Sequence, residues 1–248
     1  DNAAITIDNV EGDEDNGAIT LTATLNHRVQ GGFDLTLSSS DNTATTADSD
    51  YSAINPTLSF AGNSGEEQDF TLTPTADNIL EYDEDLKISQ DNVSNTTLGG
   101  SIDITDEATV LIKNDDNASV SINDASAAEG SDITFTVSLD NPVQDDLVVD
   151  VDFTNGTAES GDYANTSQQV TFTNENTSDQ DITVSTSSDN VLEIDEDFTA
   201  SLSINSGNTN AGTGSGTGTI TNDDAANLTI DDQSVTEGDA MNFTINLD

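Results

Sequence analysis

A nine-residue acidic stretch occurs twice in this chain, and this repeat constrains the fold more than any other feature of the sequence. Residues 77–85 read Asp-Asn-Ile-Leu-Glu-Tyr-Asp-Glu-Asp, and residues 189–197, which lie 112 positions later, read Asp-Asn-Val-Leu-Glu-Ile-Asp-Glu-Asp. Five of the nine residues in each copy are carboxylates, and neither copy contains lysine or arginine. Such a period in a chain of 248 residues predicts two modules of domain size with one acidic loop each.

The carboxylates of each stretch repel one another, so they must either be fully solvated or bind a cation. A solvated acidic turn would explain the acidity of the stretch. It would not explain why the apolar pairs Ile79-Leu80 and Val191-Leu192 repeat in the same register as the acidic positions. We therefore interpret each stretch as a calcium loop, because Ca²⁺ requires hard oxygen ligands.

Short runs rich in Thr, Val and Ile, in which apolar and polar residues alternate, occur throughout the chain. This alternation is typical of half-buried strands. The strands expected in the first repeat are 4–8, 18–25, 33–37, 58–60, 70–73, 86–88 and 109–113, and those in the second are 119–123, 133–139, 147–153, 170–172, 182–184, 198–204 and 218–221. Because turn residues separate these runs and no helical period is present, the sequence predicts an all-β chain of tandem β-sandwich modules.

The order of the runs also predicts the domain boundaries. We expect one module at 1–117, a second at 118–225, and the first two strands of a truncated third module at 226–248. Two strands are not a stable domain in water, so we expect the chain to be part of a longer tandem array. No spacer rich in Gly and Ser separates the modules, which favours a rod over beads on a flexible string.

The charge balance of the chain limits its partners. It has 3 basic and 49 acidic residues, for a net charge of −46. This charge repels nucleic acid and anionic membranes and attracts cations. The chain has no cysteine, which excludes disulfides and thiolate metal sites. We therefore expect no nucleic acid partner and no insertion into a membrane. The partners that we expect are the neighbouring modules of the same chain and other copies of the protein in a filament.

Several short motifs recur in both modules in the same order. Each has an early Glu-Gly (11–12 and 129–130), an Asp-Tyr (50–51 and 162–163), the acidic loop, and a terminal Asn-Asp-Asp (114–116 and 222–224). In this combination the chain resembles the Calx-β domain family over residues 3–116, 118–224 and, in part, 226–248. The resemblance implies immunoglobulin-like β-sandwiches that bind several Ca²⁺ ions at one end. The family occurs in sodium-calcium exchangers, integrin β4 and large bacterial surface adhesins.

The resemblance further implies a set of calcium ligands in each module. In the first module these are Glu11, Asp50, Asp77, the carbonyl of Ile79, Glu81, Glu84, Asp115 and Asp116. In the second they are Glu129, Asp162, Asp189, the carbonyl of Val191, Glu193, Glu196, Asp223 and Asp224. The best-known calcium-binding members carry a further Asp where this chain has Ala76 and Ser188, so we expect two or three ions per module. The strand order of a sandwich brings loops that are distant in sequence to one pole, where they can supply the six to eight oxygens that Ca²⁺ requires.

Two other kinds of site fit the sequence less well. Paired carboxylates perform glycosidase chemistry, but here they repeat with the module, whereas a catalytic site seldom repeats. The chain has a single histidine, His27, near a strand end, and we expect no catalytic residues and no enzyme. Residues 13–17 resemble a calcium turn but lack the ligand spacing of an EF-hand, so we interpret them as a solvated loop, with a peripheral ion site as the alternative.

Two functions remain open. The first is a calcium-rigidified stalk or filament of a secreted bacterial adhesin at the cell surface, and the second is a calcium-sensing regulatory module of a membrane transporter or receptor. Three module starts in tandem favour the stalk, which places the chain outside the cell.

Overall fold

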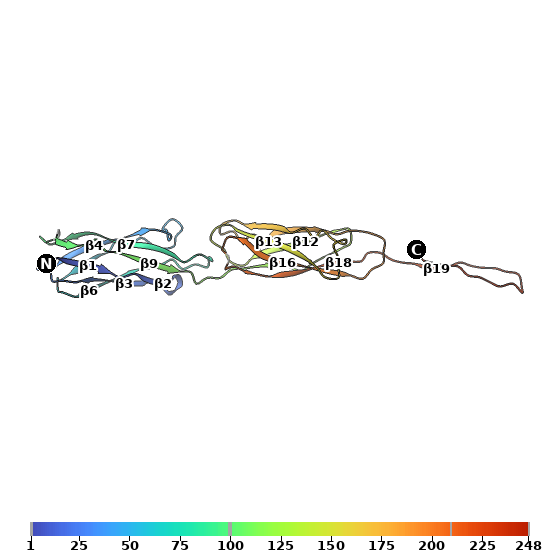
Figure 1. The fold of residues 1–248 in the computed structure, drawn as a ribbon, viewed down its shortest axis with the longest axis horizontal. Helices are drawn as coiled ribbons and strands as arrows, with labels where there is room; N and C mark the ends of the chain where they lie inside the picture. Colours follow the sequence, from blue (N-terminus) through green and yellow to red (C-terminus); the bar gives the residue numbers. More distant parts are fainter. Residues whose placement is uncertain (1, 99–100, 209, 248) are drawn as a thin grey trace. The chain divides into compact units, whose positions relative to one another are not determined.

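The computed structural model describes residues 2–98, 101–208 and 210–247. Contacts divide the chain into two units, Asp1–Asn117 and Ala118–Asp248, and both consist largely of β-strands (Figure 1). The strands follow the alternation of the sequence. In β3 (Ile19–Leu25), for example, every second side chain is buried and those between are half-buried or exposed. The all-β prediction is confirmed.

The first module is a two-layered sandwich of nine strands among the described residues of the first unit. Their bounds are β1 (Ala3–Ile7), β2 (Val10–Asp13), β3 (Ile19–Leu25), β4 (Phe33–Asp41), β5 (Thr57–Phe60), β6 (Glu66–Leu72), β7 (Glu84–Ser94), β8 (Ile102–Asp103) and β9 (Glu107–Lys113). One sheet has the order β6-β3-β1-β8 and the other the order β2-β9-β7-β4-β5. A 3₁₀ turn, η1 (Glu14–Asn16), follows β2.

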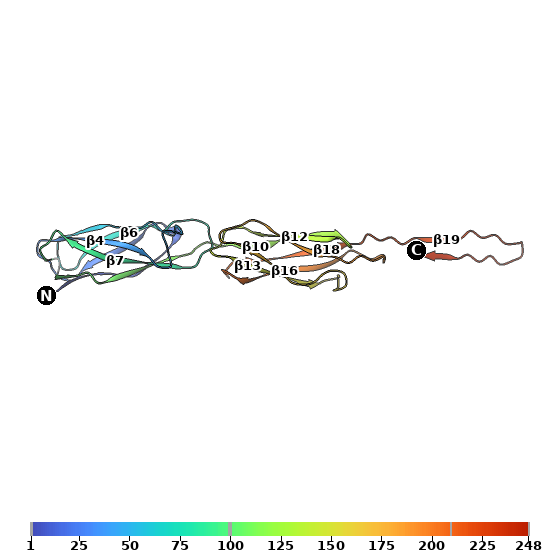
Figure 2. The same ribbon diagram turned by 90° about the horizontal axis from the view of Figure 1, so that it is seen from above.

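The second module repeats this topology. Its strands are β10 (Ser119–Ile122), β11 (Ala125–Ala128), β12 (Asp132–Leu139), β13 (Leu147–Asn155), β14 (Gln168–Phe172), β15 (Gln180–Ser185), β16 (Glu196–Ser206), β17 (Gly212–Thr213) and β18 (Ser215–Thr221). The sheets have the orders β15-β12-β10-β17 and β11-β18-β16-β13-β14, which match those of the first module strand for strand. The prediction of tandem immunoglobulin-like β-sandwiches is confirmed, and the two layers of each sandwich are visible in Figure 2.

Apolar side chains from both sheets fill the space between the layers of each module. In the first module Phe33 and Phe60 stack with ring centroids 5.0 Å apart. In the second, Tyr163 stacks on Phe198 at 4.0 Å, and Phe198 meets Phe135 edge to face at 6.0 Å. Apolar burial of this kind is the dominant favourable contribution to folding, and it holds the sheets, and so the loops at their ends, in fixed positions.

In each module the chain passes from one sheet to the other after its first strand, and this crossing brings two acidic segments side by side. In the first module β1 belongs to one sheet and the next strand, β2, to the other, where β2 pairs in parallel with the last strand, β9. In the second module β11 pairs in the same way with β18. Because parallel partners end at the same edge of a sheet, the turn after β2 or β11 lies beside the Asn-Asp-Asp that follows the last strand.

Residues beyond the second sandwich form a two-stranded hairpin. Strands β19 (Leu228–Ile230) and β20 (Ile245–Leu247) pair antiparallel, with Leu228 opposite Leu247. Ile5 stands opposite Leu25 in the same way at the start of the first module. The apolar side chains of the hairpin are exposed. That residues 226–248 begin a third module stays a prediction. No helix in the described part of the chain is long and apolar enough to span a bilayer.

Candidate metal centre

The five carboxylates of each acidic loop do not all have the same role, because one of them holds the loop in place by hydrogen bonds. The last carboxylate, Asp85 or Asp197, fixes the loop to a neighbouring segment. In the second module Oδ1 of Asp197 accepts hydrogen bonds from the backbone N–H of Thr157 at 2.9 Å and from its hydroxyl at 2.8 Å. In the first, Oδ1 of Asp85 accepts one from the hydroxyl of Thr43 at 2.9 Å. These carboxylates therefore serve the fold.

Removal of this contact is expected to destabilise the second module with or without metal. Replacement of Asp197 by Ala leaves the N–H and hydroxyl of Thr157 without their acceptor, which costs about 1–3 kcal/mol of unfolding free energy. Urea denaturation in the presence of a chelator measures the loss. Asp179→Ala, at an exposed position of the same module, is the control and should change stability by less than about 0.5 kcal/mol. Equal stabilities of the two variants would show that the Asp197 contact has no structural value.

A second pair of contacts ties the acidic loop to the end of the last strand through an asparagine that the sequence analysis did not single out as functional. In the first module the Asn114 side chain accepts a hydrogen bond from the N–H of Glu81 at 2.9 Å and donates one to the carbonyl of Asp116 at 3.1 Å. Asn222 does the same with Glu193 and Asp224, at 2.9 Å in both cases. The first residue of the Asn-Asp-Asp motif thus holds acidic groups from two segments together.

Three carboxylates of the first module, one of them a buried glutamate, lie close together. Carboxylate oxygens of Glu14, Asp115 and Asp116 all lie within 4.8 Å of one another. Glu14 is only 3% exposed, and its Oε1 and the Oδ2 of Asp116 are buried without a hydrogen-bond partner. Burial, the adjacent carboxyl group of Asp116 and the negative charges of Glu81 and Asp77 raise the pKa of Glu14 to about 8. Buried carboxylate oxygens without a partner are costly, and a bound cation would supply the missing contacts.

The structure places one predicted ligand of this module, Glu11, outside the three-carboxylate cluster. Glu11 does not reach the cluster, because its Oε1 lies 2.6 Å from Nζ of Lys113 on the outer side of the pair β2–β9. The strand register shows that Glu14, not Glu11, is the structural equivalent of Glu129. Asp13 stands opposite Lys113, so that Glu14 is the next residue, and in the second module Ala128 stands opposite Thr221, so that Glu129 is the next residue.

A signal for Glu14 was present in the sequence, although the shared Glu-Gly dipeptide led to the wrong alignment. Glu14, Glu129 and Glu237 each lie seven positions after the last apolar residue of the opening strand, which is Ile7, Ile122 or Ile230. Residues 13–17, which we interpreted as a solvated loop, therefore contain the central carboxylate of the first module.

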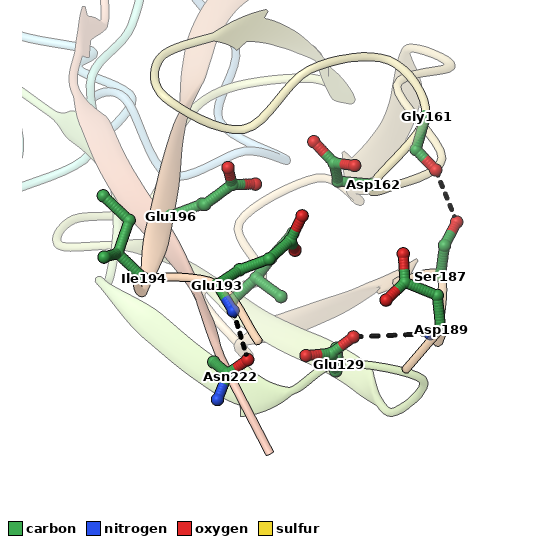
Figure 3. A pocket seen from close by; sticks show the side chains of 10 residues that line it. Glu129, Gly161, Asp162, Ser187, Asp189, Glu193, Ile194, Glu196 and Asn222 are labelled. Atoms are coloured by element: carbon green, nitrogen blue, oxygen red, sulfur yellow. Dashed lines mark hydrogen bonds between the residues drawn. The ribbon is translucent and has the colours of Figure 1, made fainter. Parts of the chain in front are cut away.

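The second module has the corresponding cluster, and two of its members, Glu129 and Asp189, line a pocket of about 60 Å³ (Figure 3). Carboxylate oxygens of Glu129, Asp189 and Asp224 lie within 4.8 Å of one another. Glu129 accepts long hydrogen bonds, 3.4 Å each, from the backbone N–H groups of Asp189 and Asp223. The pocket is further lined by Asp162, Glu193 and Glu196. The pocket thus brings together carboxylates from three separate segments of the chain, and Asp224 adds a fourth segment to the cluster.

The carboxylates in and beside this pocket repel one another, and no positive side chain that lines the pocket compensates their charge. Burial raises the pKa of Glu193, and the charges of Asp189 and Glu129 raise it further. Burial and the charge of Glu129 raise the pKa of Asp224, and burial and Asp162 raise that of Glu196. No lysine, arginine or histidine lines the pocket. A donor set made of oxygen alone suits a hard divalent cation, and the site has the character of a metal centre.

The other predicted ligands have the following places. Asp77 and Asp189 each accept a hydrogen bond at 2.7 Å from the N–H two residues on, that of Ile79 or Val191. Asp50 is buried and accepts one from the N–H of Thr45 at 2.6 Å. Glu84 is half-buried at the start of β7, and neither it nor Asp50 belongs to the three-carboxylate cluster. That each of these groups is a ligand stays a prediction.

The comparison with known families is consistent with this geometry. The Calx-beta domain matches residues 3–117 and again residues 113–234. The chain belongs to the Calx-beta domain family. The two matches account for both sandwiches, and the resemblance inferred from the Glu-Gly, Asp-Tyr and Asn-Asp-Asp motifs is confirmed.

Solved Calx-beta structures are also similar to this chain. The apo-form Calx CBD1 domain is 22% identical, with a TM-score of 0.40, and the match covers 47% of this chain and 100% of that one. The calcium binding domain CBD12 of CALX1.1 is 19% identical, with a TM-score of 0.37, over 80% of this chain and 79% of that one. CBD12 from CALX1.2 is 18% identical, with a TM-score of 0.39, over 81% of each chain. The comparison with curated proteins gives no match.

Proposed function

We propose that these Calx-beta modules are calcium-binding repeats of the stalk or filament of a secreted bacterial surface adhesin, and that calcium stiffens them. The observation that carries the proposal is the pair of equivalent carboxylate clusters, around Glu14 and around Glu129, with oxygen donors only and no compensating cation among their members. Ca²⁺ is the divalent cation that accepts six to eight oxygens in flexible geometry.

The position of the clusters connects cation binding to the stalk. Asp115 and Asp116 belong to the first cluster, and the next module begins at Ala118, only two residues later. A cation bound there would restrict the backbone of the connection. Because three module starts follow one another in the sequence, we favour a mechanical role, with adhesive and other activities elsewhere in the protein. The partners proposed are the neighbouring modules and other copies of the protein, outside the cell.

A calcium titration of the chain by calorimetry, followed by small-angle scattering, tests the proposal. Extracellular modules bind Ca²⁺ with Kd values of about 10⁻⁴–10⁻³ M, whereas sensors bind at about 10⁻⁷–10⁻⁵ M. The stalk requires binding in the weaker range and a longer, stiffer particle with calcium. Binding in the tighter range without stiffening would favour the regulatory module instead, and absence of binding would reject both functions.

Two neighbouring glutamates provide a matched pair of variants for this titration. Glu14→Gln removes the central charge of the first cluster and should weaken calcium binding there at least about tenfold. Glu11→Gln removes the same charge three residues away, where the carboxylate faces Lys113, and should leave the affinity within about twofold. If Glu11→Gln weakens calcium binding more than Glu14→Gln does, Glu11 is the ligand and the assignment of Glu14 is wrong.

A further inference from the structure

The asparagine that opens the Asn-Asp-Asp motif uses both ends of its side-chain amide. In the first module Oδ1 of Asn114 accepts a hydrogen bond from the N–H of Glu81 at 2.9 Å, and its Nδ2 donates one to the carbonyl of Asp116 at 3.1 Å. Asn222 makes the same two contacts in the second module, and the first of them is drawn in Figure 3. A carboxylate of the same size could make the first contact but not the second, because it has no N–H to donate.

The main chain of the same asparagine adds a third contact. The N–H of Asn114 donates to Oδ1 of Asp83 in the acidic loop at 3.2 Å, and the N–H of Asn222 donates to Oδ1 of Asp195 at 3.1 Å. In both modules, therefore, three hydrogen bonds through one neutral residue join two acidic segments that repel each other. Without these contacts, the repulsion would favour a wider separation of the carboxylates.

The aspartate that this asparagine holds carries an oxygen that a cation can use. Oδ2 of Asp116 and Oδ2 of Asp224 are buried, and neither has a hydrogen-bond partner among the described residues. Both aspartates belong to the three-carboxylate clusters. Because the asparagine amide holds the backbone carbonyl of the aspartate, it limits the directions in which the carboxylate can point. The oxygen of the asparagine itself already accepts a hydrogen bond from the acidic loop.

We infer that Asn114 and Asn222 are positioning residues, which hold the two acidic segments of each metal centre in the cation-binding arrangement before the cation binds. The inference rests on the proposed calcium binding and adds to it a residue that sets the affinity without being a ligand. A centre that is assembled in advance loses less binding energy to the ordering of its ligands. Residues that orient metal ligands commonly contribute about 10- to 100-fold in affinity.

Nuclear magnetic resonance of the ¹⁵N-labelled chain during a calcium titration measures the two centres separately. The amide signals of Gly12 and Gly17 report on the first centre, and those of Gly130 and Gly161 on the second. The calcium concentration at which each pair reaches half of its total shift gives the affinity of its centre, and the dispersion of the same spectra verifies that a variant is folded.

Two alanine variants test the inference, and each contains its own control. Asn114→Ala should raise the half-saturating calcium concentration of the first centre about 10- to 100-fold and change that of the second by less than about twofold. Asn222→Ala should have the reverse effect. If each variant leaves the affinity of its own centre unchanged, the inference is wrong.

A further variant separates positioning from a general loss of stability. Oδ1 of Asn9 accepts a hydrogen bond from the N–H of Thr109 at 2.7 Å, and neither residue belongs to the cluster. Asn9→Ala should lower the urea midpoint in the presence of a chelator, as Asn114→Ala does, but should change the calcium affinity of neither centre by more than about twofold. Equal losses of affinity in the two variants would overturn the inference.

Replacement of Asn114 by Asp separates positioning from ligation. Asn114→Asp keeps an oxygen for the N–H of Glu81, but it cannot donate to the carbonyl of Asp116 and repels that carbonyl instead. If the asparagine positions the centre, calcium binds more weakly to this variant than to the wild type, despite the added negative charge. Binding as tight as in the wild type, or tighter, would make position 114 a ligand position and would overturn the inference.

The outcomes for the positioning role and for calcium binding are distinguishable. If calcium moves the four glycine signals while Asn114→Ala matches Asn9→Ala, calcium binding stands and the role of Asn114 is wrong. If calcium moves none of the four signals in the wild-type chain, the proposed function is wrong and the positioning role is wrong with it.

Discussion

Calcium is expected to raise the melting temperature of the Calx-beta modules by about 10–20 °C. A ligand that binds only the folded state at one hundred times its Kd adds about 2.7 kcal/mol per site. For a domain of about one hundred residues, each kcal/mol shifts the melting temperature by roughly 4–8 °C. The structural cause is the repulsion within the clusters around Glu14 and Glu129, which the bound ion replaces by attraction.

Scanning calorimetry with saturating calcium, and with a chelator, measures this shift. Magnesium at the same concentration and ionic strength is the control, because general screening of the net charge of −46 would stabilise the fold with either ion. Mg²⁺ demands near-ideal octahedral geometry and keeps much of its water, so it should give a much smaller shift. Equal shifts with both ions would mean that the clusters are merely screened, with no specific site.

The cation-free first module is expected to lose stability as the pH rises from about 4.5 to about 8. The pKa of the Glu14 carboxyl is raised from 4.5 to about 8 in the folded protein, first by burial and then by Asp116, Glu81 and Asp77. Between these values the unfolded chain is ionised while folded Glu14 still holds its proton. The folded state binds more protons at this group, so the contribution of Glu14 to stability is full below pH 4.5 and is lost as the pH rises to about 8.

Urea denaturation at several pH values in the presence of a chelator follows this decline. Glu14→Gln keeps the size of the side chain but cannot ionise, so the curve of the variant should be flatter and should lie above that of the wild type near pH 8. Glu11→Gln is the control and should run parallel to the wild type. A Glu14→Gln curve as steep as that of the wild type would mean that other groups, or the net charge of −46, cause the decline.

Most of the fold could be predicted because its signals are local. Alternation of apolar and polar residues identifies strands such as β3 and β12, since side chains of a strand point to opposite faces in turn. Strands β8 and β17 escaped prediction because two residues are too few to show alternation. The turn η1 escaped because its sequence, Glu-Asp-Asn, equally suits a solvated loop.

The sequence located the acidic loops, but it could not show which of their carboxylates lie together, and the reason is physical. The repeat of acidic residues in the sequence was enough to locate the acidic loop in both modules, and no information on tertiary contacts was needed. It did not separate Glu81 from Asp85, which are alike in sequence, although the charge of Glu81 raises the pKa of Glu14 and Asp85 accepts a hydrogen bond from the hydroxyl of Thr43. Their roles depend on the direction in which each side chain points once the loop is anchored to the strands on either side.

The sequence by itself determined that this chain is a tandem of β-sandwiches with an acidic loop in each, because strand alternation and a repeat of 112 residues are properties of the chain alone. Only the tertiary structure decided that Glu14, not Glu11, is the central carboxylate. The parallel pairing of β2 with β9 sets that choice. Successive side chains of a strand alternate between two faces and Glu14 lies beyond the strand end, so a shift of three residues separates a salt bridge with Lys113 from the buried carboxylate cluster.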